Sequence, residues 1–265
     1  MSIDERNTME EVTDVLDSSA SGMKEVINAL DSRAAGVAPV KFWLRDDDAV
    51  LPGALLDRLL NLTETYSIPL TMAVIPAMTG EALAQRLADA SHVSVAVHGW
   101  SHTNYANQDE KKQELGDHRS SSEVLDELRQ GFTRLEQLYP EQFVPLLVPP
   151  WNRISNELVT RLSASGYKWL STFGDNPASM RDTGLVQINT QVDIIDWKGS
   201  RGGRSAALLS SEIASQIQRD QSSIGILTHH LVHDEAAWRF LEQLFKATSE
   251  HAGVRWLPVA ELLNE

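Results

Sequence analysis

Two histidines follow a short apolar stretch and could bind a metal ion together. Residues 93–97 read Val-Ser-Val-Ala-Val, which is typical of a buried strand, and His98 and His102 come directly after it. If the chain turns helically there, side chains four residues apart lie on the same side. Because α/β folds place their chemistry at strand ends, the pair favours a metal site, although two such histidines can also simply form hydrogen bonds.

Three successive aspartates, Asp46, Asp47 and Asp48, follow another apolar stretch. Their mutual repulsion would be relieved by a nearby cation, and the alternative is a solvated acidic turn. One carboxylate and two imidazoles form a ligand set with open positions, which suits Zn²⁺ and also accepts Fe²⁺, Co²⁺, Ni²⁺ or Mn²⁺. A neighbouring carboxylate that is not bound to the metal could serve as a general base.

Strand and helix patterns alternate through most of the chain. The predicted strands cover residues 40–45, 68–75, 93–98, 143–148, 167–172, 184–189, 224–229 and 254–257, and the predicted helices 52–66, 80–90, 120–139, 154–165, 204–219 and 234–251. This alternation predicts an α/β fold, a distorted (β/α) barrel of about seven parallel strands over residues 37–265. An amphipathic stripe over residues 4–33 predicts an N-terminal helical extension, residues 1–36.

The composition narrows the possible partners. The net charge is −14 with no basic cluster, which argues against nucleic acid and anionic membranes as partners. There is no cysteine, so a metal must use nitrogen and oxygen ligands. The polar N-terminus and the lack of an apolar run of about 18 residues predict a cytoplasmic protein without a membrane span. The oligomeric state stays open, with a homodimer as one option.

Five short motifs, in this order, resemble those of the polysaccharide deacetylases of the NodB-homology type, carbohydrate esterase family 4. They are Asp47-Asp48-Ala49, His98-Gly-Trp-Ser-His102, Val148-Pro-Pro-Trp-Asn152, Asp193-Ile-Ile-Asp196-Trp197 and Leu227-Thr-His229. They are similar to that family's Thr-Phe-Asp-Asp-Gly, His-x-x-x-His, Arg-Pro-Pro-Tyr-Gly, Asp-x-x-Asp-Trp and Leu-x-His elements. The resemblance extends from about Val40 to about Leu231.

The resemblance implies a metal-dependent hydrolase that removes an acetyl group from an N- or O-acetylated sugar or a related amide. Asp48, His98 and His102 would bind the metal, most simply Zn²⁺. Asp47 would be the general base and His229 the general acid.

The same resemblance implies roles for two tryptophans. The backbone N–H of Trp151 would help to hold the oxyanion, and Trp197 would line the pocket for the acetyl methyl group. Trp100, Trp151 and Trp197 all lie in motif loops, where an exposed indole suits stacking on a sugar ring.

The sequence departs from the family pattern at one important place. The family's third motif begins with an arginine that orients the base, and here that residue is Val148. Arg153, five residues later, is the first candidate to replace it, and Arg45 is the second.

Three assignments stay open at this stage. A one-residue slip would make Asp46 the base and Asp47 the ligand. Neighbours on a strand face opposite ways, so either His229 or His230 could point into the site. Asp196 could orient catalytic groups or cap the loop that follows it.

Two other functions compete with the deacetylase. The missing arginine allows a catalytically inactive, deacetylase-like protein that binds carbohydrate or regulates a partner. Two histidines and a carboxylate also occur in non-haem iron oxygenases, but that triad is more usual on all-β scaffolds.

Overall fold

The computed structural model describes residues 23–33, 38–175, 185–219 and 221–263. The chain forms two compact units, each built from separate parts of the sequence. Unit 1 contains Met1–Phe42, Ile194–Ile224 and Val232–Arg255, and unit 2 contains Trp43–Asp193, Gly225–Leu231 and Trp256–Glu265. The boundary predicted near residue 36 falls outside the described residues, and so does most of the helical stripe predicted over residues 4–33.

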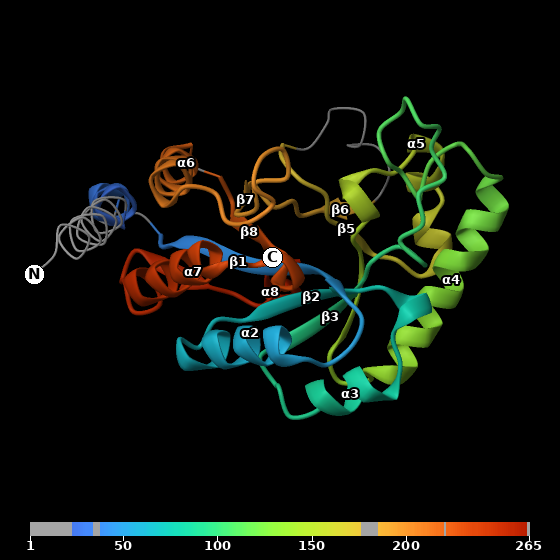
Figure 1. Ribbon diagram of the computed structural model, residues 1–265, viewed down its shortest axis with the longest axis horizontal. Coiled ribbons are helices and arrows are strands. Elements are labelled where there is room, and N and C mark those ends of the chain that lie inside the picture. The colour runs from blue at the N-terminus through green and yellow to red at the C-terminus, as the bar shows by residue number, and fades with distance from the viewer. Residues whose placement is uncertain (1–22, 34–37, 176–184, 220, 264–265) are drawn as a thin grey trace, which may run out of the picture. The chain divides into compact units, whose positions relative to one another are not determined.

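The strands form one curved sheet, and most of its residues belong to unit 2 (Figure 1). Its strands are β1 (Val40–Ala49), β2 (Leu70–Val74), β3 (Val93–Val97), β4 (Phe143–Leu147), β5 (Trp169–Leu170), β6 (Val186–Gln187), β7 (Val192–Asp193), β8 (Ile224–Thr228) and β9 (Val254–Trp256). The order is β6-β5-β4-β3-β2-β1-β8-β7, and β9 also pairs with β1. The pairs β1–β2, β2–β3, β3–β4, β4–β5, β5–β6 and β7–β8 are parallel. The predicted parallel (β/α) barrel is therefore confirmed as a fold class.

The two ends of this sheet are joined by one short stretch of chain, residues 186–193. Its first part pairs with β5, where the amide of Ile188 donates to the carbonyl of Leu170 at 3.0 Å. Its last part pairs with β8, where the amide of Gln191 donates to the carbonyl of Gly225 at 2.8 Å. The chain itself thus closes the barrel, in place of a ladder between β6 and β7.

Helices follow most strands, as the alternating pattern predicts. They are α2 (Ala54–Thr65), α3 (Glu81–Leu87), α4 (Ser121–Leu138), α5 (Asn156–Val159), α6 (Ala206–Gln218), α7 (Glu235–Thr248) and α8 (Val259–Leu262), with short 3₁₀ turns η1 (Pro76–Met78), η2 (Pro150–Asn152), η3 (Leu162–Ser165) and η5 (His230–Val232). Ser120 caps α4 by accepting the Glu123 amide, as its capping-box motif predicts. None of the helices in the described ranges is long and apolar enough to span a bilayer.

Two boundaries differ from the sequence prediction. The helix predicted over residues 154–165 is two short pieces, α5 and η3, which end at Gly166 with φ 95°. Strand β1 does not end before the aspartates but runs through them to Ala49. It continues because β2 still pairs with it there, at Asp46–Met72 and Ala49–Val74.

An apolar cluster fills the interior of unit 2 around Trp43, which is fully buried. Its members come from β1 to β4, residue 188 and the C-terminal helix: Trp43, Ala73, Ala96, Val144, Leu146, Val148, Ile188, Val259 and Leu263. Small residues make room for the indole. A Cβ at Gly225 on β8 would lie 2.5 Å from Trp43 Nε1 and 2.8 Å from Thr190 Cα.

In unit 1, a helix over residues 23–33 packs through buried Val26 and Leu30. Arg33 Nη1 donates to the carbonyl of Ile217 in α6 at 3.1 Å. Asp31 Oδ1 lies 3.1 Å from Nε2 of His251, which follows α7. The C-terminal part of the predicted N-terminal helix is therefore attached to α6 and α7.

Replacement of Gly225 by alanine should destabilise the protein, because Trp43 and the backbone at Thr190 leave no room for a methyl group. Overpacking of this kind costs about 1–3 kcal/mol. Urea unfolding followed by circular dichroism measures the loss. The control is Gly53→Ala, whose Cβ meets no atom within 4 Å. Its free energy of unfolding should fall by less than about 1 kcal/mol, which is what replacing the glycine N-cap of α2 with alanine would cost. Equal losses in the two variants would contradict this account of the core.

Candidate metal centre

The end of β1 directs two adjacent carboxylates to the same place. On a regular strand, neighbouring side chains face opposite ways. Here the register with β2 shifts between Asp46 and Ala49, and Asp48 has φ 72°, so the strand carries a bulge. Asp48 consequently lies beside His98, while Asp47 keeps the inward direction of Trp43 and Arg45, at alternate positions of the same strand.

Asp48, His98 and His102 converge as a possible metal site. Asp48 Oδ1 lies 3.0 Å from His98 Nε2 and 3.2 Å from His102 Nε2. One ligand atom from each residue lies within 4.8 Å of the other two. Ligands at about 2.0–2.2 Å from a tetrahedral ion are about 3.3–3.6 Å apart, and the two distances from Asp48 are close to that spacing, so the set is compatible with a Zn²⁺-sized ion.

The backbone fixes which nitrogen of His98 faces the site. His98 Nδ1 lies 2.9 Å from the carbonyl oxygen of Val148, which can only accept, so Nδ1 carries a proton. Nε2 is then directed at Asp48. A carbonyl that orients the far nitrogen of a histidine is typical of metal sites, and this contact supports the fit.

The electrostatics of the three residues differ. Burial alone would raise the pKa of Asp48, but the hydrogen bond with His98 and the charges of the neighbouring histidines lower it well below its ordinary value. Burial alone would lower the pKa of His98, but Asp48 and Asp47 raise it. Burial and the neighbouring His98 lower the pKa of His102. A carboxylate anion therefore lies between two imidazoles.

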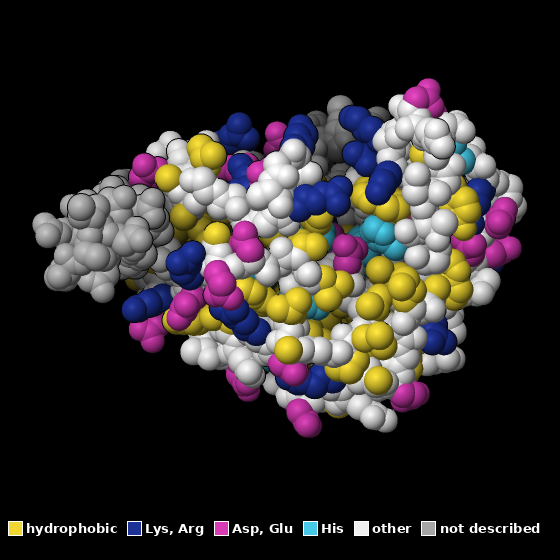
Figure 2. All heavy atoms as spheres, viewed as in Figure 1, with side chains coloured by type: hydrophobic (Ala, Val, Ile, Leu, Met, Phe, Trp, Pro, Cys, Tyr) yellow, Lys and Arg dark blue, Asp and Glu magenta, His cyan; other side chains and the backbone are white. Residues whose placement is uncertain are grey.

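The site is only partly covered. Asp48 and His102 keep 30% and 22% of their side chains exposed, whereas His98 is buried. In Figure 2, histidine side chains reach the surface beside an acidic side chain, with hydrophobic side chains around them. A ligand from solvent can therefore approach the group.

Left-handed backbone concentrates around this group. Asp48, Gly99, His102, Trp151 and Asn152 all have φ between 54° and 72°. Such conformations cost non-glycine residues of order 1 kcal/mol or more, and they persist where surrounding contacts enforce them. Trp151 is one example, because its ring lies 4.2 Å from that of His102, centroid to centroid.

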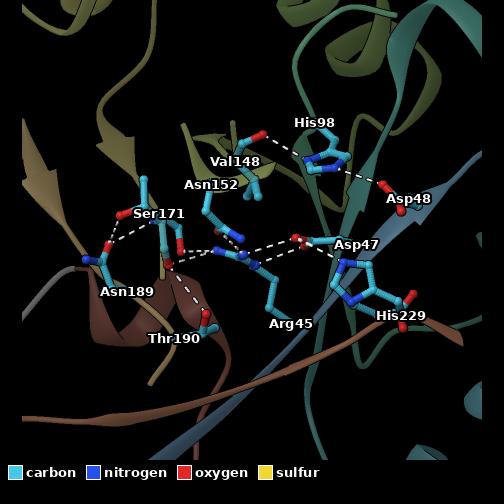
Figure 3. A network of polar contacts seen from close by, with 12 residues as sticks. Arg45, Asp47, Asp48, His98, Val148, Asn152, Ser171, Asn189, Thr190 and His229 are labelled. Carbon is cyan, nitrogen blue, oxygen red and sulfur yellow. Dashed lines mark hydrogen bonds and ion pairs between the residues drawn. The ribbon is translucent and has the colours of Figure 1, made fainter. Parts of the chain in front are cut away.

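A fully buried arginine, Arg45, holds Asp47 (Figure 3). Its Nη2 donates to Asp47 Oδ2 at 3.0 Å, and its Nε lies 2.9 Å from Oδ1. The same Nη2 donates to Asn152 Oδ1 at 2.7 Å, and Nη1 donates to Ser171 Oγ at 2.7 Å. A two-point contact between guanidinium and carboxylate fixes the orientation of both groups.

The two candidate arginines have different partners. Arg153, the first candidate from the sequence, donates from Nη1 to the carbonyl of Lys112 at 2.9 Å. Arg45, the second candidate, makes the contact with Asp47. It can do so because residues two apart on a strand share a face. Val148 itself is fully buried in the apolar cluster with Trp43.

The two adjacent histidines after β8 have different partners. The amide of His230 donates to Asp46 Oδ2 at 2.7 Å, and its ring Nδ1 contacts Asp46 Oδ1. Burial alone would lower the pKa of His230, but the Asp46 carboxylate raises it. His229 is the histidine near Asp47, with Nε2 4.0 Å from Asp47 Oδ2. The geometry therefore favours His229 over His230 as the histidine that faces Asp47. It also favours the pair Asp47 and Asp48 over the pair Asp46 and Asp47, which a one-residue slip would give.

Three further predicted residues have contacts of their own. Trp100 is half-buried, and its carbonyl accepts the Ala77 amide at 2.9 Å. Asp196 and Trp197 belong to unit 1. Asp196 accepts the amides of Gly199 and Ser200 there, which is the loop-capping alternative left open by the sequence. Trp197 keeps 43% of its surface exposed.

Sequence reasoning did not single out two groups of residues that the structure places at this site. Ser171 and Asn189 support Arg45 and the backbone after β5, where Asn189 Oδ1 accepts the Thr172 amide at 2.8 Å. Glu114 binds the loop between the two histidines. A polar residue within a strand pattern, such as Asn189, is the one signal that could have drawn attention to this group.

Comparisons with known proteins agree with this arrangement. The family model described as "Polysaccharide deacetylase" matches residues 43–170. No curated protein sequence matches the chain. Several solved structures share its fold at low sequence identity.

Three of these structures illustrate the likeness. A Mycobacterium smegmatis protein described as a polysaccharide deacetylase superposes with a TM-score of 0.62 and 15% identity, over 86% of this chain and 93% of that chain. A "T48 deacetylase with substrate" gives a TM-score of 0.55 and 18% identity, over 85% and 92%. A mutant of a family 4 carbohydrate esterase pseudoenzyme gives 0.57 and 18%, over 85% and 67%.

These likenesses agree with each other. The matched range contains the aspartate triplet and both histidines, and the fold agrees over most of the chain. The sequence identities of 15–18% show that the chain has diverged far from these structures. Residues 43–170 therefore match the polysaccharide deacetylase family, and the chain shares the fold of these structures at low sequence identity.

Proposed function

We propose that this chain is a divalent-metal-dependent deacetylase that hydrolyses the acetyl group of an N- or O-acetylated sugar or a related amide. One observation carries the proposal. Asp47, held by Arg45, lies 4.0 Å from His229, and the residue after Asp47 belongs to the Asp48–His98–His102 group. A base, an acid and a metal-binding group thus meet at one edge of the sheet, where α/β barrels place their catalytic residues.

Asp48, His98 and His102 would hold the ion, and the donor set suits Zn²⁺ best, with Co²⁺, Ni²⁺, Fe²⁺ or Mn²⁺ as alternatives. When bound, such an ion supplies Lewis acidity toward the acetyl carbonyl and the attacking water. The protein supplies the proton transfers and the orientation of the reacting groups.

In the proposed reaction, Asp47 takes a proton from the water as it attacks the acetyl carbon. Arg45 keeps the carboxylate turned toward the site by contacting both of its oxygens. The backbone N–H of Trp151, in its left-handed turn, donates to the oxygen that becomes negative. His229 gives a proton to the departing nitrogen or oxygen, which completes the hydrolysis.

Substrate recognition is assigned to aromatic side chains. Trp100 and Trp151 each have partly exposed indoles, which suit the apolar faces of sugar rings, and a substrate-binding role for Trp197 stays a prediction. The net charge of −14 favours a neutral acetylated carbohydrate over an anionic polymer. A cytoplasmic location and a catalytic role for Asp196 stay predictions.

A catalytically inactive, carbohydrate-binding or regulatory protein is the second candidate. Val148 in place of the family arginine favours it, and one structure with this fold is described as a pseudoenzyme. The contact between Arg45 and Asp47 supports an active deacetylase. Arg45 on β1 supplies a guanidinium to Asp47, although position 148, which follows β4, has no arginine.

Metal binding provides the first test. Metal-free protein titrated with Zn²⁺ or Co²⁺ should bind one ion, and Asp48→Asn or His102→Ala should weaken binding by more than about 100-fold, because each removes a direct ligand. Calorimetry measures both. The matched control His251→Ala changes a histidine of unit 1 paired with Asp31 and should keep wild-type affinity. Wild-type affinity in His102→Ala would contradict the ligand assignment.

Acetate release tests the reaction itself. The metal-loaded protein should release acetate from chitooligosaccharides or small acetamides, and Asp47→Asn should lower kcat about 10²–10⁴-fold, because it removes the base. Metal affinity and melting temperature are measured alongside. The control Asp57→Asn removes a surface carboxylate paired with Arg86 and should leave kcat unchanged. Equal background turnover in wild type and Asp47→Asn, with metal bound, would favour the inactive protein.

Two conservative substitutions distinguish the arginines. Arg45→Lys keeps the charge but cannot contact both oxygens of Asp47, so kcat should fall about 10–100-fold with metal affinity retained. Arg153→Lys should stay within about twofold of wild type, because Arg153 contacts only a carbonyl of a surface loop among the described residues. The reverse result would assign the orienting role to Arg153.

A further inference from the structure

A buried carboxylate outside the family motifs, Glu114, lies beside the loop that carries the two histidines. Only 1% of Glu114 is exposed. It belongs to the long connection between β3 and α4, which forms neither helix nor named strand. A carboxylate buried at this depth is costly unless polar groups replace its water. Its partners therefore indicate why it is there.

Those partners are consecutive backbone groups between His98 and His102. Glu114 Oε1 accepts the amide of Ser101 at 2.7 Å and its hydroxyl at 3.1 Å. Oε2 accepts the amide of Trp100 at 3.3 Å. Both oxygens are thus used on the three-residue stretch that separates the histidines, and charge-assisted bonds of this kind are stronger than neutral ones.

Gly99 fits closely against the same carboxylate. It has φ 60°, and a Cβ there would lie 2.1 Å from Glu114 Oε2 and 2.6 Å from Pro150 Cγ. Only a bare backbone can pass between these two groups. The left-handed turn after His98 and the position of Glu114 therefore depend on each other.

The segment that carries Glu114 is anchored on its other side to the loop after β4. The amide of Ser155 donates to the carbonyl of Leu115 at 2.8 Å, and Leu115 forms a β-bridge with Ile154. Arg153 Nη1 donates to the carbonyl of Lys112 at 2.9 Å. Residues 112–115 thus connect the histidine loop with the loop that contains Trp151.

We propose that Glu114 is a positioning residue that holds the 98–102 loop in the conformation in which His98 and His102 face Asp48. The contacts above join it to neither imidazole, and it acts through two backbone amides and the Ser101 hydroxyl. The proposal rests on the metal site of the proposed function, but its first readout is a property of the metal-free protein. No lysine or arginine pairs with Glu114 within the described part of the chain, so binding these amides is its main interaction.

Hydrogen exchange of the metal-free protein tests the proposal directly. Glu114→Gln keeps the shape but replaces one acceptor oxygen with an amide group that cannot accept. The Trp100 and Ser101 amides should exchange at least about tenfold faster than in wild type, while amides of β2 and β3 keep their protection. Zn²⁺ affinity should fall about 10–100-fold, the range for residues that orient metal ligands.

Glu110→Gln is the matched control, because Glu110 lies in the same connection and also accepts a backbone amide, that of Asn107, at the surface. It should change neither readout. Unchanged exchange and affinity in Glu114→Gln would overturn the proposal, and so would equal loss of protection in β3, which would indicate a general stabilising role. If Glu114→Gln shows faster exchange and weaker Zn²⁺ binding but the wild type releases no acetate, the proposed deacetylase activity is overturned. The positioning role of Glu114 then still holds.

Discussion

The ion pair between Arg45 and Asp47 is the interaction on which the rest of this site depends. Both side chains are almost completely buried, so each would be costly without the other. The guanidinium also binds Asn152, Ser171 and the carbonyl of Thr172, which follow β4 and β5. One side chain from β1 thus connects the ends of three strands, and it holds Asp47 in the same set of contacts.

The departures from the family pattern are related to each other through this arginine. Val148 faces the interior, where it packs with Trp43. The guanidinium that contacts Asp47 belongs to Arg45, two residues before it on the same face of β1. Asn152, where the family has glycine, accepts a left-handed φ of 55° and also binds the guanidinium. These three differences are therefore better understood as one rearrangement than as three separate losses.

Much of the fold and the membership of the site could be predicted from local sequence. The alternating pattern predicts the parallel α/β barrel, and the spacing of His98 and His102 predicts that they lie together, as they do in the group with Asp48. The choice of Arg45 over Arg153 could not be predicted, because it depends on which way β1 faces. The bulge at Asp48 and the contact of Glu114 with the 98–102 loop depend on pairing between distant segments, which no local pattern encodes.

The aspartate triplet shows how the fold overcomes a local conflict. Three adjacent carboxylates repel one another, and on a regular strand the middle one would face away from the other two. Here each has a separate positive or hydrogen-bonding partner: Asp46 has His230, Asp47 has Arg45, and Asp48 has His98. The bulge makes this separation possible by turning Asp48 away from its regular direction. The repulsion is therefore offset by Arg45 within β1 and by histidines that follow β3 and β8, and each carboxylate keeps its own partner.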